Sequence, residues 1–209
     1  MINSELTSGF RAVSKSFKLW WDDWANQVLV SLLAVLLSLT IILLPASLMG
    51  IFYETNQLIN GTKTGFVGFW IGFKSHFLKS LAWGVVCFAG IFFTVINLWF
   101  YINIKASWAY LLVGFTIILG SIFFLVQFYT PGFFTMNVDK SLIGAWKRSF
   151  AFIFSYPVHV IVIGFVALLL SIFTIVLILP LLIGFPPLVS LISLISIRSM
   201  QSQVSQTTN

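Results

Sequence analysis

The sequence predicts an all-α membrane protein: a polytopic bundle of transmembrane helices, flanked by basic amphipathic helices at the membrane surface. First, 59% of its 209 residues are hydrophobic and only 8% are charged, against about 25% charged in soluble domains. Second, four tracts (24–53, 80–104, 106–138 and 149–197) contain no Asp, Glu, Lys or Arg, and each exceeds the roughly 20 residues a membrane helix needs. Third, runs such as "VLVSLLAVLLSLTIILL" lack the period-two alternation of a membrane β-strand.

The first element is an amphipathic helix over residues 8–24, "SGFRAVSKSFKLWWDDW". Phe10, Phe17 and Trp24 recur at helical spacing on one side, with basic residues largely on the other. Such a helix lies in the membrane interface, with tryptophan at the headgroup level and lysine or arginine toward anionic lipid. The predicted basic anchors on this segment are Arg11, Lys15 and Lys18.

The next apolar tract predicts one crossing before Pro45 and a return over residues 45–60. Sixteen residues span about 24 Å as a helix, which is short but sufficient where the bilayer thins. Basic residues support the return. With six crossings, ten of the eleven basic residues lie inside and only Lys105 outside, whereas the best five-crossing arrangement places seven inside. The positive-inside rule therefore favours six crossings, with five as the alternative and both termini in the cytoplasm of a bacterial cell.

Residues 61–80, "GTKTGFVGFWIGFKSHFLKS", predict a second interfacial helix that turns into the third crossing. Gly68 and Gly72 lie on another stripe of this helix, and their spacing would also let a neighbouring helix approach closely. Aromatic residues share one side: Phe66, Phe69, Trp70, Phe73 and Phe77. Further basic anchors are Lys74, Lys79, Lys147 and Arg148.

The last tract is too long for one helix, because residues 160–197 would extend about 57 Å. Pro180 and Gly184 provide a break, which predicts helices over 154–179 and 181–198. The order of segments in 10–60 resembles that in 143–200, which suggests an internal repeat. We expect one transmembrane domain over 1–200 and a disordered polar tail over 201–209.

Reactive side chains are few: five carboxylates, two histidines and one cysteine. His76, His159 and Cys87 lie on three separate segments without metal-ligand spacing. We therefore predict no catalytic residue, metal or cofactor. The net charge of +6 comes from basic residues beside apolar tracts, which indicates anionic lipid headgroups rather than nucleic acid.

Glu54 is the strongest candidate for a functional side chain. If residues 45–60 cross the membrane, a polar stripe at helical spacing forms there: Ser47, Gly50, Glu54 and Gln57. An acid inside a membrane helix usually faces the bundle interior or a water-filled cavity, with Asn97, Gln127 and His159 as possible partners. The alternative places Glu54 near the cytoplasmic end, solvated or paired with Lys63.

Three segments resemble the YesL-like family of small bacterial integral membrane proteins. These are "GFRAVSKSF", "LLPASLMGIFYETNQLINGT" and "FVGFWIGFKSHFLKS"; the last carries the family's aromatic block as Phe66, Phe69, Gly72 and Phe73. The proline-then-glycine turn is also similar to glycerophosphodiesterase-type membrane domains. The resemblance implies a link with carbohydrate uptake systems, and the family has no established catalytic residues to carry over to this chain.

Three hypotheses for function follow. The leading one is a non-enzymatic accessory or scaffold protein of the plasma membrane that serves a membrane-protein partner such as a transporter. The second is a small transporter or lipid-handling protein that uses the stripe around Glu54. The third, a membrane-embedded enzyme, requires at least two converging reactive groups.

Overall fold

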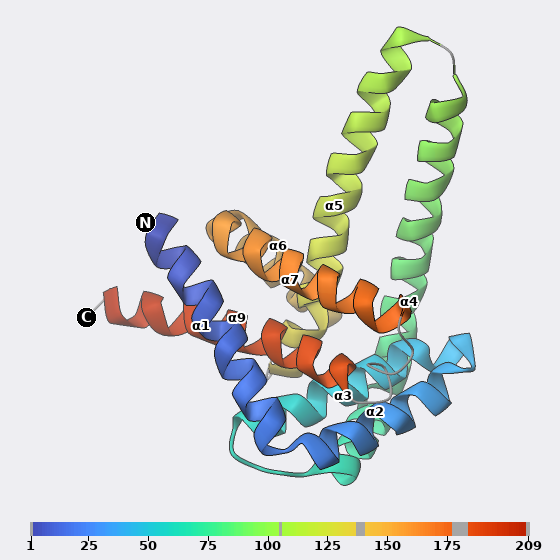
Figure 1. Cartoon of the computed structure of the whole chain (residues 1–209). Coiled ribbons are helices and arrows are strands. Elements are labelled where there is room, and N and C mark those ends of the chain that lie inside the picture. Colours follow the sequence, from blue (N-terminus) through green and yellow to red (C-terminus); the bar gives the residue numbers. More distant parts are fainter. Residues whose placement is uncertain (1, 105, 137–140, 177–183, 208–209) are drawn as a thin grey trace.

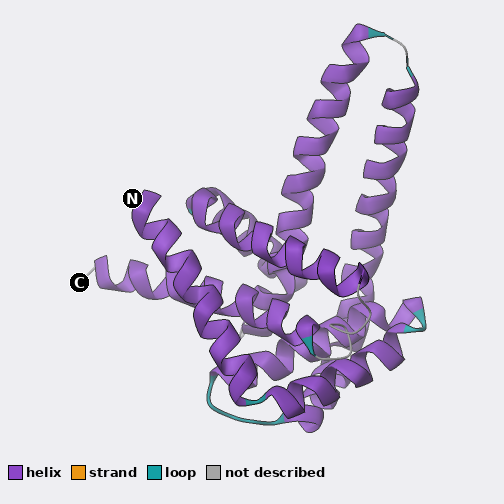
Figure 2. Cartoon of the chain, in the orientation of Figure 1, coloured by secondary structure: helices purple, strands orange, loops and turns teal. Residues whose placement is uncertain are grey.

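The computed structural model describes residues 2–104, 106–136, 141–176 and 184–207, and within these ranges it is all-helical without strands (Figure 2). The predicted all-α class is confirmed. The helices are α1 (Ile2–Asp22), α2 (Trp24–Ser38), the 3-10 turn η1 (Ile41–Leu43), α3 (Leu44–Ile59), α4 (Gly65–Asn103), α5 (Ser107–Met136), α6 (Leu142–Ser155), α7 (Pro157–Val176) and α9 (Phe185–Thr207).

Helices α2 and α3 form a hairpin, so the chain does return after Pro45 (Figure 1). Asp23 separates α1 from α2 with a non-helical φ of −134°. Pro45 lies in the first turn of α3, where its missing N–H removes no helical hydrogen bond. The predicted out-and-back path of residues 24–60 is therefore present. Its two helices, of 15 and 16 residues, are short for crossing a bilayer.

Helix α4 is one continuous helix of 39 residues, about 58 Å long. The predicted turn between a surface helix and the third crossing is absent. Proline or an inserted side chain is the usual cause of a sharp helix kink, and residues 65–103 contain no proline. Helical hydrogen bonding therefore continues from the aromatic segment into the apolar one.

The molecule has two parts, a helical body and an arm that projects from it (Figure 1). We define the arm as residues 85–124, the second half of α4 with the first part of α5. Its helices approach closely because Gly90 faces the ring of Phe123 and Gly120 faces Thr94. The remaining described residues form the body, in which the first half of α4 packs antiparallel against α3.

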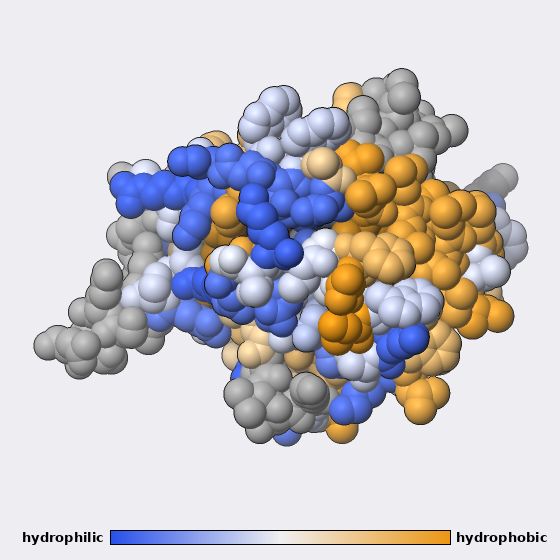
Figure 3. Space-filling view, turned by 90° about the horizontal axis from the view of Figure 1, so that it is seen from below, coloured by the Kyte–Doolittle hydropathy of each residue, from blue (hydrophilic) through white to orange (hydrophobic). Residues whose placement is uncertain are grey.

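The body encloses two apolar clusters. The larger joins α1, α5, α7 and α9 through fully buried side chains, among them Tyr129, Phe134, Ile163 and Leu191. The smaller lies between α2, α3 and α4 and includes Val30, Ala46, Ile51, Phe69 and Phe73. Seen from below, hydrophilic side chains gather on one side of the body and hydrophobic ones on the other (Figure 3).

Three helices of the described chain are long and apolar enough to cross a membrane: α4, α5 and residues Pro157–Thr174 of α7. They support membrane association. Helix α9 is not among them. Gly184, just before α9, lies against the Gln27 backbone of α2, and its carbonyl accepts a hydrogen bond of 2.8 Å from Trp20 Nε1 of α1. Helix α9 packs along α1 and continues to Thr207, into the segment predicted as a polar tail.

The segment predicted as one helix from residue 154 is divided at Tyr156, where α6 ends and α7 begins with Pro157. The predicted break at Pro180 lies outside the described residues. The order amphipathic helix, apolar helix, returning helix appears twice, as α1–α2–α3 and as α6–α7–α9. The packing partners differ, because α3 lies along α4 and α9 lies along α1.

Replacing Gly72 by alanine should destabilise the body. An added Cβ would overlap the Tyr53 side chain on α3, and overpacking of this kind costs about 1–3 kcal/mol. Gly114 of the arm is the matched control, since an added Cβ there meets nothing within 4 Å. Thermal unfolding in detergent should show a lower Tm for Gly72→Ala and no loss for Gly114→Ala. Equal Tm values for Gly72→Ala and the parent would contradict the α3–α4 packing.

Candidate functional site: a buried carboxyl network around Glu54

Glu54 lies on α3 with its side chain completely buried, at 0% exposure. Its Oε1 accepts a hydrogen bond of 3.0 Å from Nε2 of Gln27 on α2, which is equally buried. Gly68 of α4 also lies beside the Glu54 side chain: a Cβ added at Gly68 would be 3.6 Å from the Glu54 Cγ. Helix α4 therefore packs against the Glu54 side chain at the level of Gly68.

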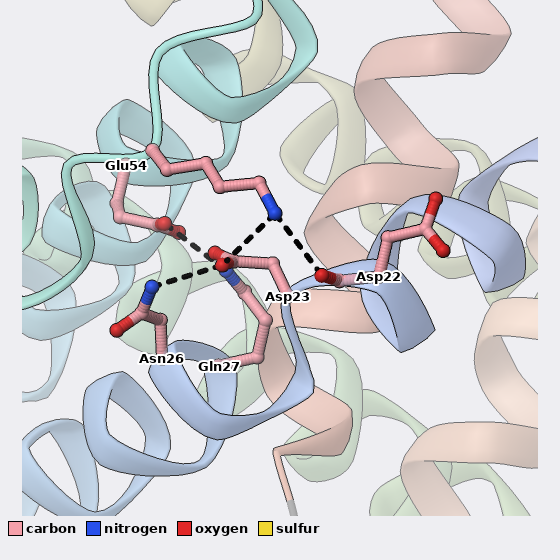
Figure 4. A network of polar contacts seen from close by, with 6 residues as sticks. Asp22, Asp23, Asn26, Gln27 and Glu54 are labelled. Atoms are coloured by element: carbon pink, nitrogen blue, oxygen red, sulfur yellow. Dashed lines mark hydrogen bonds and ion pairs between the residues drawn. The ribbon is translucent and has the colours of Figure 1, made fainter.

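Gln27 connects Glu54 to a second carboxylate, Asp23 (Figure 4). The Gln27 Nε2 also lies 3.4 Å from Asp23 Oδ2, and Asn26 Nδ2 donates to Asp23 Oδ1 at 2.9 Å. Lys63 Nζ lies 3.7 Å from the same Oδ1 and donates to the Asp22 carbonyl at 3.1 Å. We call Asp23, Asn26, Gln27, Glu54 and Lys63 the Glu54 network. It leads from Lys63, whose side chain is 56% exposed, to a buried acid.

Two oxygens of the Glu54 network, Glu54 Oε2 and Gln27 Oε1, are buried without a hydrogen-bond partner. The pKa of Glu54 is raised from 4.5 to about 7, chiefly by burial; the Gln27 hydrogen bond lowers it and the charge of Asp23 raises it by smaller amounts. The carboxyl group lies on α3, outside the three apolar helices. It is thus neutral in a large fraction of molecules near pH 7, and its protonated form is also a hydrogen-bond donor.

The other members of the predicted stripe do not enter this network. The Ser47 hydroxyl donates to the Leu43 carbonyl at 3.0 Å within its own helix. Gly50 lies against Phe69, and Gln57 is half-buried. Lys63 contacts Asp23 rather than Glu54. The three polar residues considered as partners for Glu54 have other hydrogen-bond partners within the described chain: Asn97, Gln127 and His159.

The aromatic segment 66–77 is helical as predicted, and its side chains divide between two environments. Phe69 and Phe73 are buried against α2 and α3, whereas Phe66 is exposed and Trp70 and Phe77 are half-buried. The face containing Gly68 and Gly72 packs on α3. The spacing of Gly68 and Gly72 also predicts that a neighbouring helix approaches closely. The helix that does so is α3 of the same chain.

The predicted basic anchors lie on the outside of the body. Arg11, Lys15 and Lys18 are exposed on α1. On α4, Lys74 Nζ lies 5.0 Å from the Trp70 ring centroid and Lys79 Nζ lies 5.9 Å from that of Phe134. The two anchors on α6, Lys147 and Arg148, are exposed.

A second polar cluster surrounds His159, which is completely buried on α7. Its Nε2 lies 2.7 Å from Ser196 Oγ of α9, and its Nδ1 lies 3.0 Å from Ser8 Oγ of α1. Its backbone N–H donates to the Glu5 carboxylate at 3.2 Å. A serine–histidine pair occurs in nucleophilic catalysis, but both of these side chains are 0% exposed. The cluster joins three helices through hydrogen bonds.

A third polar cluster lies where the arm meets the body. Gln127 Oε1 accepts hydrogen bonds from Trp83 Nε1 at 2.8 Å and Trp146 Nε1 at 3.2 Å, and Cys87 Sγ lies 3.6 Å away. One sequence signal is common to the three clusters: a polar residue inside or beside an apolar tract. Their pairings depend on tertiary contacts that spacing along the chain does not contain.

Over the described residues, no group of three or more His, Cys, Asp and Glu side chains is placed to hold a metal ion. Glu54, Cys87 and His159 each have different hydrogen-bond partners, and His76 packs against the rings of Tyr53 and Phe134. No family model matches the chain, and neither the curated proteins nor the solved structures include a match.

Protonation of Glu54 should make stability depend on pH. Because its folded pKa of about 7 exceeds the unfolded value of 4.5, the folded state binds more protons between these values. The free energy of unfolding should fall as pH rises through that window, by at most about 3 kcal/mol, and then level off. Glu54→Gln should remove this dependence and be more stable than the parent at pH 8.

Thermal unfolding between pH 4.5 and 8 measures the effect. The exposed acid Asp22 provides a control, since Asp22→Asn leaves Glu54 in place and should keep the parent's pH dependence. Parallel curves for the parent and Glu54→Gln would show that Glu54 is ionised throughout.

Proposed function

We propose that the chain is an integral membrane protein of the bacterial plasma membrane with a non-enzymatic accessory role. In this role the arm binds a transmembrane helix of another membrane protein. The observation that carries the proposal is the surface of the arm, which is apolar on its outside and has a groove lined in part by small and polar residues.

The outside of the arm is suited to hydrocarbon. Large apolar side chains on both helices are strongly exposed, including Phe92 at 65%, Trp99 at 70% and Leu111 at 77%. Each square ångström of such surface in water costs about 25 cal/mol, so immersion in lipid stabilises the arm. Helix α7 adds to this membrane-facing surface through Ile161 and Phe165.

The distribution of basic residues supports one orientation of the chain in the membrane. All nine basic residues that the structure describes lie in the body; of the other two, Lys105 falls in the sequence between α4 and α5 and Lys140 between α5 and α6. By the positive-inside rule the charged part of the body and both termini face the cytoplasm, while α7 stays in contact with the bilayer. Six crossings would require α2 and α3 to span the bilayer. We propose instead that this short hairpin stays on the cytoplasmic side, with its exposed apolar tip at Leu39, Ile41 and Ile42 dipping into the leaflet.

The groove lies between α4 and α5 and encloses about 430 Å³. Its small and polar lining consists of Gly90, Thr94, Asn97, Thr116 and Gly120. Small residues let a second helix approach closely, and an amide in an apolar setting gains from hydrogen bonding to a neighbouring helix. Asn97 is placed for this, since its own Nδ2 donates only locally, to the Phe93 carbonyl at 2.8 Å.

The resemblance to the YesL-like family suggests solute uptake systems as the first class of partner to test. A second candidate function is transport or lipid handling through Glu54, favoured by the two unpaired buried oxygens at that site. In that case Glu54→Gln should abolish flux or lipid binding while the protein remains folded.

Cysteine labelling in intact cells tests the orientation. On a Cys87→Ser background, Ala106→Cys at the tip of the arm should react with a membrane-impermeant thiol reagent. Thr62→Cys and Ser202→Cys, both exposed on the body, should react only after the cells are permeabilised. Labelling of the body positions with protection of the tip would reverse the proposed orientation.

Substitution of Asn97 tests the groove. In mildly solubilised native membranes, Asn97→Leu should remove a complex larger than the monomer, because it eliminates the amide that a partner helix would bind. Asn103 is a matched control on the same helix, exposed near the tip and outside the groove, and Asn103→Leu should retain the complex.

Native gel electrophoresis with mass spectrometry reads out this experiment. Co-expression of two differently tagged copies distinguishes a second copy of the chain from another membrane protein. Equal loss in both variants, or no complex in the parent, would count against binding through the groove.

A further inference from the structure

A cavity between α1 and α9 collects three cationic side chains that are distant in the sequence. It encloses about 340 Å³ and is lined by Arg11 and Lys15 of α1 and by Arg198 of α9. Arg11 and Lys15 are one helical turn apart and so lie on the same side of α1. Ala12, Ile59 and Ile195 form an apolar part of the lining, with Ser199 and Ser202 beside the cations.

A hydrogen bond to Asn56 of α3 holds the Arg198 side chain in place. Its Nη2 donates to Asn56 Oδ1 at 2.6 Å, and Asn56 Nδ2 in turn donates to the Thr135 carbonyl at 3.2 Å. The Arg198 Nε–H is buried without a hydrogen-bond partner. A guanidinium group has five N–H donors, so this anchored side chain has donors left for a ligand.

The positive charge of the cavity is uncompensated. Within the described part of the chain, the one ion pair joins Lys63 to Asp23, and no carboxylate lines the cavity. Three like charges that share a small cavity repel one another, and an anion between them relieves this repulsion. Arginine binds phosphate oxygens through charge-assisted hydrogen bonds, and lysine adds a point charge.

We propose that this cavity is a binding site for a phosphate group. Arg198 is the anchored hydrogen-bond donor, and Arg11 and Lys15 supply further positive charge to the phosphate. The chemistry is shared by two sources, the headgroup of an anionic phospholipid and free inorganic phosphate. The apolar lining next to the cations suits a phosphate ester that carries a hydrocarbon portion. The site is separate from the arm and does not depend on the partner proposed for it.

The test uses the purified full chain in phosphatidylcholine nanodiscs. In one set of samples phosphatidylglycerol is added to the nanodiscs. In a second set inorganic phosphate is added, with the ionic strength matched by chloride. Thermal unfolding and native mass spectrometry measure stabilisation and bound ligand. We expect Lys15→Gln and Arg198→Gln to weaken binding about tenfold or more. Lys18→Gln, which removes the same charge from α1 outside the cavity, should bind as the parent does.

The outcomes separate the two sources. Stabilisation by phosphatidylglycerol that Lys15→Gln reduces identifies a lipid headgroup site, and stabilisation by phosphate alone identifies a free-anion site. Arg198→Gln also loses the contact with Asn56. If Arg198→Gln fails to fold, the result is decided by Lys15→Gln, which lies at an exposed position. No stabilisation by either ligand, or equal weakening by Lys18→Gln, would overturn the proposal.

Discussion

The close contact between α3 and α4 is the constraint on which the rest of the structure depends. Gly50, Gly72 and Gly84 each stand where a larger residue would overlap the opposite helix, so the two helices approach along much of α3. Because α4 continues without a break, the surface that fixes its first half in the body also fixes the direction of the arm. A change at this interface therefore alters the position of the arm as well as the packing of the body.

The same contact explains why an acid is buried at position 54. With α4 packed against α3 at Gly68, the Glu54 side chain is completely buried, and Gln27 donates to its Oε1. A buried carboxylate with a single hydrogen bond is costly, and it lowers the cost by taking up a proton. The His159 cluster differs, since both ring nitrogens of that residue have partners. Glu54 is thus a polar group in the body whose protonation state depends on its surroundings.

The sequence predicted what local patterns determine: the helical class, the amphipathic helix before Trp24, and the reversal at Pro45. It missed the continuity of α4, because the change from a mixed to an apolar composition near Ser80 looked like a boundary, although no helix breaker occurs there. It identified Glu54 but not Gln27, because nothing in the spacing of the two residues reveals that α2 and α3 meet at that level. For the same reason the sequence predicts Arg198 at the end of a helix but does not reveal that it lies near Arg11 and Lys15.

Tryptophan side chains lie at both ends of the arm, and the distance between these two levels is comparable to the thickness of a bilayer's hydrocarbon core. Trp83 and Trp146 meet at Gln127 where the arm joins the body, and Trp99 and Trp108 are exposed near the tip. Sixteen residues of α4 separate the two levels, about 24 Å of helix. Tryptophan prefers the interfaces on either side of the hydrocarbon core, which is about 30 Å thick and adjusts by local thinning. In the proposed orientation, the two levels bound the membrane-spanning part of α4, with Lys79, one turn before Trp83, on its cytoplasmic side.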